Sequence, residues 1–231
     1  MQYEALITDT IQESPDVTTL VFSVDGRTLP FTAGQYTTVR LAVDGGVVVG
    51  KAYSLSSIPS DSHMSITVKR LGDFSSRLCD MKTGDTLTIT KPYGFFNAQT
   101  SAPIVAIAGG VGISPIWSII RDEISRAPEK EISLLHTGQK SSDLIFREKV
   151  TQLFAGHPHA VAHHFVTRDA DSDAHSRRLS VENDMTKNQR DTADFYLCGS
   201  ETFVRGVYQS LAQAEVDERR IHTEIFFESA P

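Results

Sequence analysis

Cysteine is scarce in this chain. Cys79 and Cys198 are the two cysteines among 231 residues. Two thiols cannot supply the four thiolates of a tetrahedral thiolate site or of a plant-type iron–sulfur cluster. Any metal site would therefore depend on histidine and carboxylate side chains.

An excess of positive charge and a long apolar run are also missing. The chain has 22 Lys and Arg against 29 Asp and Glu, a formal charge of −7 at pH 7, whereas nucleic-acid binding needs many cations that neutralise phosphates. No apolar run reaches the roughly 18–20 residues of a membrane-spanning helix. A strand-like segment, residues 3–11, follows Met1 directly, so no secretory signal is expected. These absences predict a soluble, cytoplasmic protein.

Short strands separated by turns are expected over the first hundred residues. Polar and apolar side chains alternate in several of them, which is typical of half-buried antiparallel strands. The expected strands include residues 17–24, 34–43, 64–70 and 86–91. Strands at this spacing predict an antiparallel β barrel or a sandwich, and we expect the barrel to occupy residues 1–99.

The pattern changes after a polar stretch near residue 100. Residues 104–108 are wholly apolar, as in a buried parallel strand. Further strands are expected at 132–136, 161–167, 195–198 and 223–227, with helices at 115–126, 144–154 and 201–214. Strands that alternate with helices predict a doubly wound parallel sheet. We assign it to an α/β nucleotide-binding domain of residues 103–231.

A glycine turn joins the first strand of that sheet to the first helix. The turn contains Gly110, Gly112 and Ser114, and Pro115 follows. Glycine lets a phosphate approach the backbone, and a helix N-terminus attracts anions. An ordinary tight turn would share these residues, and the proline departs from the usual GxGxxG pattern of dinucleotide sites.

Three further segments carry chemistry. Cys198 and Gly199 end a strand on the side where the glycine turn lies, although a strand-end cysteine is more often a small buried hydrophobe. Residues 51–54 offer a cation, an aromatic ring and a hydroxyl, although an edge-strand aromatic would look alike. Residues 72–78 read as a turn and a short helix, capped by Ser75 or Ser76, which could equally be an ordinary helix start.

The order of these motifs resembles the ferredoxin–NADP reductase superfamily of flavin-dependent reductases. The series runs from about Phe31 to Phe227, through the Lys-x-Tyr-Ser segment, the Gly-x-x-Ser turn, the glycine turn, Cys-Gly and Glu-x-Phe. The resemblance implies an NAD(P)H-dependent oxidoreductase with FAD in the barrel. It also implies that hydride passes from NAD(P)H to the flavin, which then hands electrons on singly.

By this resemblance, Tyr53 would lie against the isoalloxazine and Ser54 would bond near its reactive nitrogen. Lys51 stands where the family usually has arginine, and it would pair with a flavin phosphate without the bidentate fork of arginine. The other flavin contacts implied are Ala52, Val68, Lys69, Gly72, Ser75 and Ser76.

The resemblance also assigns the nicotinamide nucleotide. Gly110, Gly112 and Ser114 would meet its pyrophosphate, and Cys198 with Gly199 would lie beside the nicotinamide. Glu224 would lie near the flavin edge, and Phe226 or Phe227 would cover the flavin face. Ser54, Cys198 and Glu224 would be the catalytic residues that align the two rings.

The choice of nucleotide depends on the strand ends at Thr137 and at Thr167-Arg168. Arg168, Arg177 and Arg178 could hold a 2′-phosphate, and residues 136–140 contain no acidic residue for a free ribose diol. We therefore expect NADPH rather than NADH, with a merely solvated arginine loop as the alternative.

The electron acceptor is expected to be a separate protein, such as a ferredoxin, a flavodoxin or an oxygenase component. A basic rim of residues 69, 70, 77, 82 and 91 could steer an acidic partner. Reduction of free flavin or a small acceptor, and a non-catalytic electron-bridging subunit, are the alternatives. We expect no metal site, because the histidines of residues 157–164 have no carboxylate or thiol beside them in the sequence.

Overall fold

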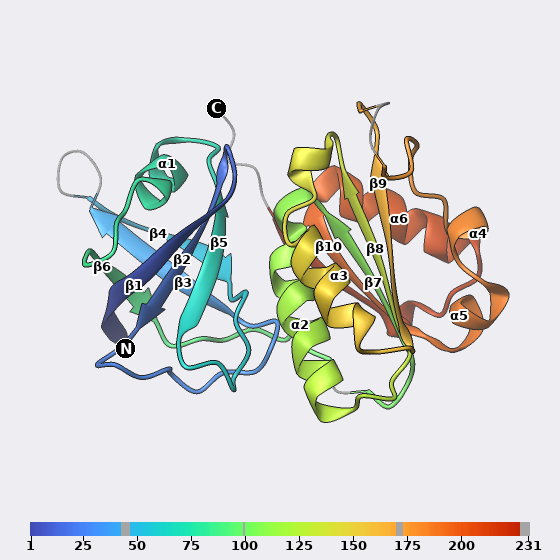
Figure 1. Cartoon of the computed structure of the whole chain (residues 1–231), viewed down its shortest axis with the longest axis horizontal. Helices are drawn as coiled ribbons and strands as arrows, with labels where there is room; N and C mark the ends of the chain where they lie inside the picture. The colour runs from blue at the N-terminus through green and yellow to red at the C-terminus, as the bar shows by residue number, and fades with distance from the viewer. Residues whose placement is uncertain (43–46, 99, 170–172, 227–231) are drawn as a thin grey trace.

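The computed structural model describes residues 1–42, 47–98, 100–169 and 173–226. It contains an antiparallel sheet at the N-terminal end and a parallel sheet with helices at the C-terminal end, side by side (Figure 1). Both parts of the expected fold are therefore confirmed. The division near residues 99–103 stays a prediction.

Six strands form the antiparallel sheet, in the order β4-β3-β6-β1-β2-β5. A bridge between Leu55 and Ile66 joins the two edges, which gives the sheet its barrel-like shape. Alternate side chains such as Ala5, Ile7, Leu20 and Val39 are fully buried inside it, as the period-2 pattern requires. The elements are β1 (Gln2–Ser14), β2 (Val17–Ser23), β3 (Tyr36–Ala42), β4 (Val48–Ser54), β5 (Met64–Lys69), α1 (Asp73–Cys79) and β6 (Thr86–Thr90).

The parallel sheet has the order β11-β10-β7-β8-β9. Strands β8 and β9 are added on one side of β7, whereas β10 and β11 are added on the other side. Ligands of doubly wound folds bind at this switch point, between β7 and β10. Helices α2 and α3 cover one face and α6 the other (Figure 1). The strands and larger helices are β7 (Ile104–Gly109), α2 (Ile113–Arg126), β8 (Ile132–Gly138), α3 (Arg147–Ala155), β9 (Ala160–Val166), β10 (Asp194–Ser200), α6 (Glu201–Gln213) and β11 (Ile221–Phe226). The short helices are η2 (Gly110–Gly112), η3 (Ser141–Asp143), α4 (Val181–Asp184), α5 (Lys187–Thr192) and η4 (Glu218–Arg220).

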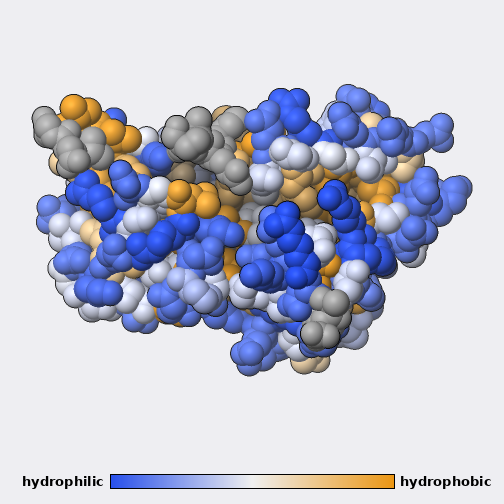
Figure 2. Space-filling model, turned by 90° about the horizontal axis from the view of Figure 1, so that it is seen from above, coloured by the Kyte–Doolittle hydropathy of each residue, from blue (hydrophilic) through white to orange (hydrophobic). Residues whose placement is uncertain are grey.

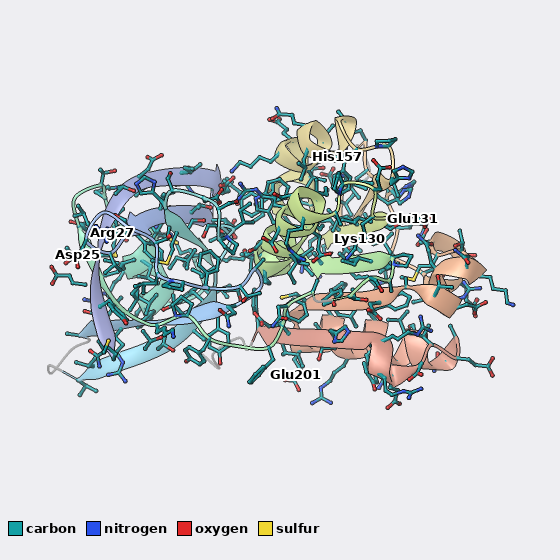
Figure 3. The ribbon with its side chains drawn as sticks, turned by 90° about the horizontal axis from the view of Figure 1, so that it is seen from below. Asp25, Arg27, Lys130, Glu131, His157 and Glu201 are labelled. Atoms are coloured by element: carbon teal, nitrogen blue, oxygen red, sulfur yellow. The ribbon has the colours of Figure 1, made fainter. Side chains whose placement is uncertain are left out.

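Side chains of the α/β part hold the connection between the sheets. Lys130 donates hydrogen bonds to the buried Glu123 of α2 and to the Thr100 carbonyl. Arg126 pairs with the same glutamate and donates to the Ala98 carbonyl. Lys130, labelled in Figure 3, lies between α2 and β8. The polar stretch near residue 100 is therefore anchored along α2.

Two helix starts differ from the sequence-based prediction. Helix α3 begins at Arg147 rather than at residue 144, because Phe146 has φ +62° and cannot continue a right-handed helix. Helix α1 begins at Asp73 with the extended Gly72 as its N-cap. The prediction that Ser75 or Ser76 caps this helix is therefore wrong.

Candidate functional site

A cavity of about 860 Å³ lies between the two sheets, at the carboxyl ends of the parallel strands. This volume falls in the range of about 300–1,000 Å³ that is common for ligand sites. Figure 2 shows the molecule from this side, with apolar surface visible between charged side chains over the α/β half. Of the residues predicted to bind cofactor, the cavity is lined by Lys69, Gly110, Thr137, Thr167, Arg168 and Phe226.

The glycine turn after β7 forms the floor of the cavity. Gly110 has φ +52°, a conformation that favours glycine. Gly112 lies so close to β10 that an added Cβ would overlap the Cys198 carbonyl. At Gly109 an added Cβ would lie 2.7 Å from the Phe203 ring. The turn therefore keeps its backbone bare against the cavity, as a phosphate-binding turn requires.

Ser54 and Glu224 meet across the two sheets. Ser54 ends β4 and its hydroxyl donates a hydrogen bond to the Glu224 carboxylate of β11, 170 residues away in sequence. Burial raises the pKa of Glu224 to about 7, although the Ser54 bond acts in the opposite direction. The carboxyl group can therefore gain or lose a proton near neutral pH. Phe226, two positions along the same strand, lines the cavity.

Cys198 lies deeper than expected. Its side chain is fully buried, and Cys198 is not among the residues that line the cavity. It is the direct register partner of Glu224 in the parallel sheet. Burial raises the pKa of this thiol, and the neighbouring Glu224 raises it further, so it stays protonated. A position beside the nicotinamide, shared with Gly199, stays a prediction.

Lys51 and Tyr53 gather around Phe74 of α1. The Lys51 ammonium lies 5.5 Å from the centre of the Phe74 ring. The Tyr53 ring stacks on the same ring, with centroids 6.3 Å apart and planes 14° apart. Burial raises the pKa of the Tyr53 hydroxyl, which keeps this ring neutral. Strand β4 and helix α1 thus present a cation and an aromatic ring together, whereas Ala52 points away between them.

The serines of α1 fill different roles from those expected. The Ser75 hydroxyl accepts hydrogen bonds from the backbone N–H groups of Leu71 and Gly72 and donates one to the Gly72 carbonyl. The serine hydroxyl is thus engaged in shaping the turn. Ser76 donates its backbone N–H to the Gly72 carbonyl. Their contact with a pyrophosphate stays a prediction.

Lys69 crosses from the barrel towards the α/β part. Its ammonium lies 3.4 Å from an Asp16 carboxylate oxygen and 3.7 Å from one of Asp143. Asp143 in turn accepts hydrogen bonds from the backbone N–H groups of Gln139 and Lys140. Val68, the preceding residue, is fully buried in the barrel core, so any flavin contact would use its backbone.

Three arginines border the far end of the cavity. Arg168, Arg177 and Arg178 line it together with Thr137 and Thr167. Arg177 is already engaged, because its guanidinium pairs with Asp184 and lies over the Phe165 ring. Within the described residues, Arg168 and Arg178 have no ion pair. Phe227, the alternative to Phe226 as flavin cover, lies outside the described residues.

The sequence reasoning missed several residues of this region. Ser200, Thr202 and Phe203 line the cavity at the start of α6. Phe74 was read only as part of a turn. His136 is fully buried and its ring contacts the Gly110 carbonyl of the glycine turn. A histidine on the same strand face as the buried Ile132 and Leu134 was the signal that could have marked it.

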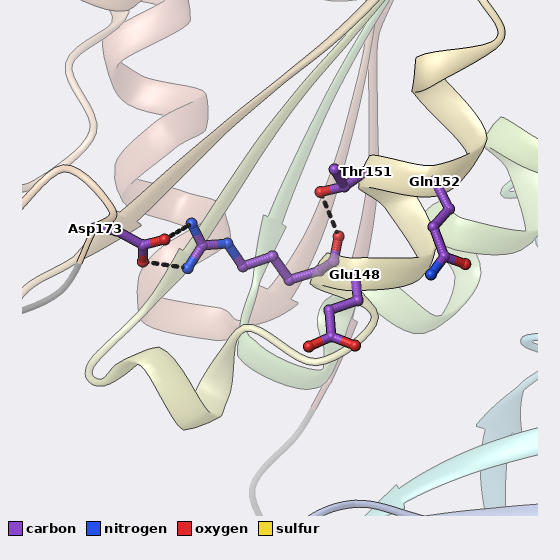
Figure 4. Close-up of a pocket in the computed structure, with 5 residues that line it drawn as sticks. Glu148, Thr151, Gln152 and Asp173 are labelled. Atoms are coloured by element: carbon purple, nitrogen blue, oxygen red, sulfur yellow. Dashed lines mark hydrogen bonds and ion pairs between the residues drawn. The ribbon is translucent and has the colours of Figure 1, made fainter.

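The remaining histidines do not form a metal site in the described part of the chain. His157, labelled in Figure 3, forms a hydrogen bond to the Leu153 carbonyl at the end of α3. A second, surface cavity of about 470 Å³ lies beside α3 (Figure 4), where Arg147 and Asp173 form a two-fold ion pair. The Arg147 guanidinium in this cavity is thus already paired with the Asp173 carboxylate. No helix in the described ranges is long and apolar enough to cross a membrane.

Two family models match the two parts of the chain. The model described as oxidoreductase FAD-binding domain matches residues 4–98, and the oxidoreductase NAD-binding domain matches residues 106–209. A flavohemoprotein of Bacillus subtilis is 30% identical over 228 residues, which are 93% of this chain and 57% of that protein. The chain thus spans a little over half the length of such relatives.

Solved structures agree on the fold. The flavohem-like FAD/NAD binding domain of nitric oxide dioxygenase from Vibrio cholerae has a TM-score of 0.89 at 24% identity, covering 97% of this chain and 98% of that one. A ferredoxin NADP+ reductase from Neisseria gonorrhoeae with bound FAD and NADP has a TM-score of 0.82 at 21% identity, covering 98% and 99%. The chain therefore consists of an oxidoreductase FAD-binding domain followed by an oxidoreductase NAD-binding domain, in the two-part fold that it shares with these reductases.

Proposed function

We propose that this chain is an NADPH-dependent reductase that takes hydride onto FAD and passes electrons to a separate protein. The observation that carries the proposal is the cavity at the glycine turn of the α/β part, which is also lined by Lys69 and Leu71 of the barrel part. Bound FAD supplies the two-electron to one-electron chemistry. We place the enzyme in the cytoplasm, since both cysteines are free and buried.

Ser54 and Glu224 orient the reacting groups, and the Glu224 carboxyl group holds or releases a proton near neutral pH. Ser54 is nearly fully buried, and its hydroxyl is aimed by the Glu224 carboxylate. Because the pKa of Glu224 is raised to about 7, this carboxyl group can hold a proton close to the flavin at neutral pH. Phe226, on the same strand as Glu224, lines the cavity.

NADPH is the proposed donor because Arg168 and Arg178 border the cavity. A 2′-phosphate would pair with these guanidinium groups, whereas NADH offers only hydroxyls there. Asp143 also lines the cavity but is bound by backbone N–H groups and lies near Lys69. We expect kcat/KM for NADPH to exceed that for NADH. Arg178→Ala should reduce this preference about tenfold and leave the NADH value within twofold.

The acceptor is proposed to be a redox protein rather than a small molecule. The basic rim gives weak support, because Arg70 is paired with Asp80 and Arg77 donates to the Ala42 carbonyl. The names of the curated relatives, flavohemoproteins, add haem proteins to the candidate partners. Rates with a ferredoxin, cytochrome c and free FMN separate these classes. Faster reduction of free FMN than of any protein would support a free-flavin reductase instead.

The central test is an anaerobic titration of the purified flavoprotein with NADPH. Full bleaching of the flavin at one equivalent is the expected result. Ser54→Ala should slow flavin reduction in single turnover at least tenfold and change FAD affinity less than threefold. Unchanged single-turnover reduction in this variant would overturn the role of Ser54. A bound flavin that neither nucleotide bleaches would support a non-catalytic subunit.

A further inference from the structure

A buried histidine lies directly beneath the glycine turn. His136 of β8 has no exposed surface, and its Nε2 lies 3.2 Å from the Gly110 carbonyl oxygen. A carbonyl oxygen only accepts hydrogen bonds, so Nε2 carries the hydrogen and donates a hydrogen bond to the Gly110 carbonyl. Burial, followed by the neighbouring His164, lowers the pKa of His136 to about 3. The ring is therefore a neutral, single hydrogen-bond donor.

Packing alone does not explain a histidine at this position. Within the described residues its other nitrogen, Nδ1, is buried without a hydrogen-bond partner. A buried acceptor that lacks a partner costs at least as much stability as one neutral hydrogen bond contributes. An apolar side chain of similar size would fill the same space without that cost. The contact with Gly110 is what distinguishes histidine from leucine here.

The geometry of the peptide bond gives this contact a consequence for the cavity. No cis peptide bond occurs in the described ranges, and in a trans peptide the C=O and the following N–H point in opposite directions. The Gly110 carbonyl points towards the buried His136 ring, so the N–H of Val111 in the same peptide points away from that ring. Gly110 and Val111 both line the cavity, so that N–H faces the position of an anionic ligand.

Because residue 110 is glycine, the plane of the Gly110–Val111 peptide can flip with little steric cost. Gly110 has φ +52°, and glycine populates positive and negative φ with similar ease. A turned peptide would present a carbonyl oxygen, instead of an N–H, to a phosphate. The Ile113 N–H also bonds the Gly110 carbonyl within η2, but such three-residue turns have poor hydrogen-bond geometry. His136 adds a second donor from β8, the strand next to β7 in the parallel sheet.

We propose that His136 is a positioning residue that locks the Gly110–Val111 peptide with its N–H towards the nucleotide pyrophosphate. The inference rests on the proposed nucleotide site and extends it to a residue that touches neither cofactor. It predicts an effect on nucleotide binding, with no effect on FAD binding in the other half of the molecule.

His136→Leu removes the donor, and His136→Gln keeps an amide N–H near the same place. His164→Leu is the matched control, because His164 is the register partner of His136 on β9 and the two rings lie 6.0 Å apart. Its Nδ1 is likewise buried without a hydrogen-bond partner in the part of the chain that the structure describes. For each FAD-loaded variant, NADP+ binding would be measured by calorimetry, with FAD content and Tm recorded alongside. KM for NADPH and the limiting rate of flavin reduction complete the set.

The proposal expects the Kd for NADP+ and the KM for NADPH to rise at least fivefold in His136→Leu. The limiting rate, FAD content and Tm should stay close to those of the unchanged protein. His136→Gln should recover binding to within twofold, and His164→Leu should bind normally. Unchanged NADP+ affinity in His136→Leu, or equally weak binding in the Gln and Leu variants, overturns it. A failure of the unchanged protein to bind either nucleotide would instead overturn the proposed function.

Discussion

Glu224 is a carboxyl group whose ionisation opposes folding. Its pKa is raised from 4.5 to about 7 by burial. The folded protein therefore holds this proton more tightly than the unfolded chain. The stabilisation is complete below pH 4.5 and is lost as the pH rises through 7. The full difference is on the order of 3 kcal/mol.

Glu224→Gln should remove this pH dependence, because glutamine stays neutral and can still accept the Ser54 hydrogen bond. We expect the variant and the unchanged protein to unfold with similar free energies at pH 5. At pH 8 the variant should be more stable, by about 2–3 kcal/mol. Urea unfolding at the two pH values, at equal FAD concentration, measures this. A difference that does not change with pH contradicts the raised pKa.

Phe74 links two residues expected to bind the flavin. It contacts the Lys51 ammonium and stacks on Tyr53, and cation–π and ring-stacking contacts each contribute about 0.5–1.5 kcal/mol. Phe74→Leu keeps an apolar side chain in the barrel core but should weaken FAD binding about tenfold. Phe74→Tyr keeps the ring and serves as the control. If a fluorescence titration gave Phe74→Leu and Phe74→Tyr equal affinities for FAD, the Phe74 ring would not support the flavin site.

The turn between β7 and α2 depends on close contact between two backbones. Gly112 lies against the Cys198 carbonyl and the Gly199 N–H, and neither backbone group can rotate away as a side chain would. Gly112→Ala should therefore destabilise the protein by about 3 kcal/mol and impair nucleotide binding. Chemical unfolding, together with the KM for NADPH, measures both effects.

Gly206 in α6 is the matched control for this substitution. An added Cβ there would lie in open space, and alanine favours a helix interior over glycine by about 0.5–1 kcal/mol. Gly206→Ala should therefore stabilise the protein slightly. If both variants lost stability equally, the contact between the turn and β10 would not be the cause.

The two halves of the molecule are joined by polar contacts on either side of α2. Arg121 forms a two-fold ion pair with Asp61 of the barrel, with both N–O distances 2.7 Å. The Ser118 hydroxyl donates to the Ser57 carbonyl, and Lys149 of α3 pairs with the buried Glu13. Burial alone would raise the pKa of Asp61, but the hydrogen bonds from Arg121 and the Ile58 backbone lower it. These contacts set how the barrel faces the nucleotide domain.

Arg121→Met should lower stability by about 2 kcal/mol, because it leaves Asp61 without its charged partner. It should also speed proteolytic cleavage near residue 100, where the connection runs along α2. Arg205→Met, which breaks an exposed pair within α6, should change either quantity little. Identical cleavage rates in the two variants would show that the Asp61 pair does not hold the halves together.

Much of this molecule could be read from local sequence patterns. Alternating side chains in β5 and the apolar run of β7 marked a half-buried and a fully buried strand, because each environment imposes its own period. The start of α3 was misplaced, since a left-handed Phe146 leaves no composition signal. Helix α1 is predicted correctly, but its N-cap is Gly72 rather than a serine, because Ser75 lies at the third helical position and accepts a hydrogen bond from the Gly72 N–H.

Local sequence patterns are enough to predict the two-part fold and the order of the motifs, since periodicity and turn residues act over a few neighbouring positions. Tertiary structure alone decided which motifs meet: Ser54 with Glu224, Lys51 with Phe74, and His136 with Gly110. It also buried Cys198 beneath the cavity. Contacts between distant residues depend on how the sheets pack, and so do the desolvation that raises the pKa of Glu224 and the direction in which the Gly110 peptide points.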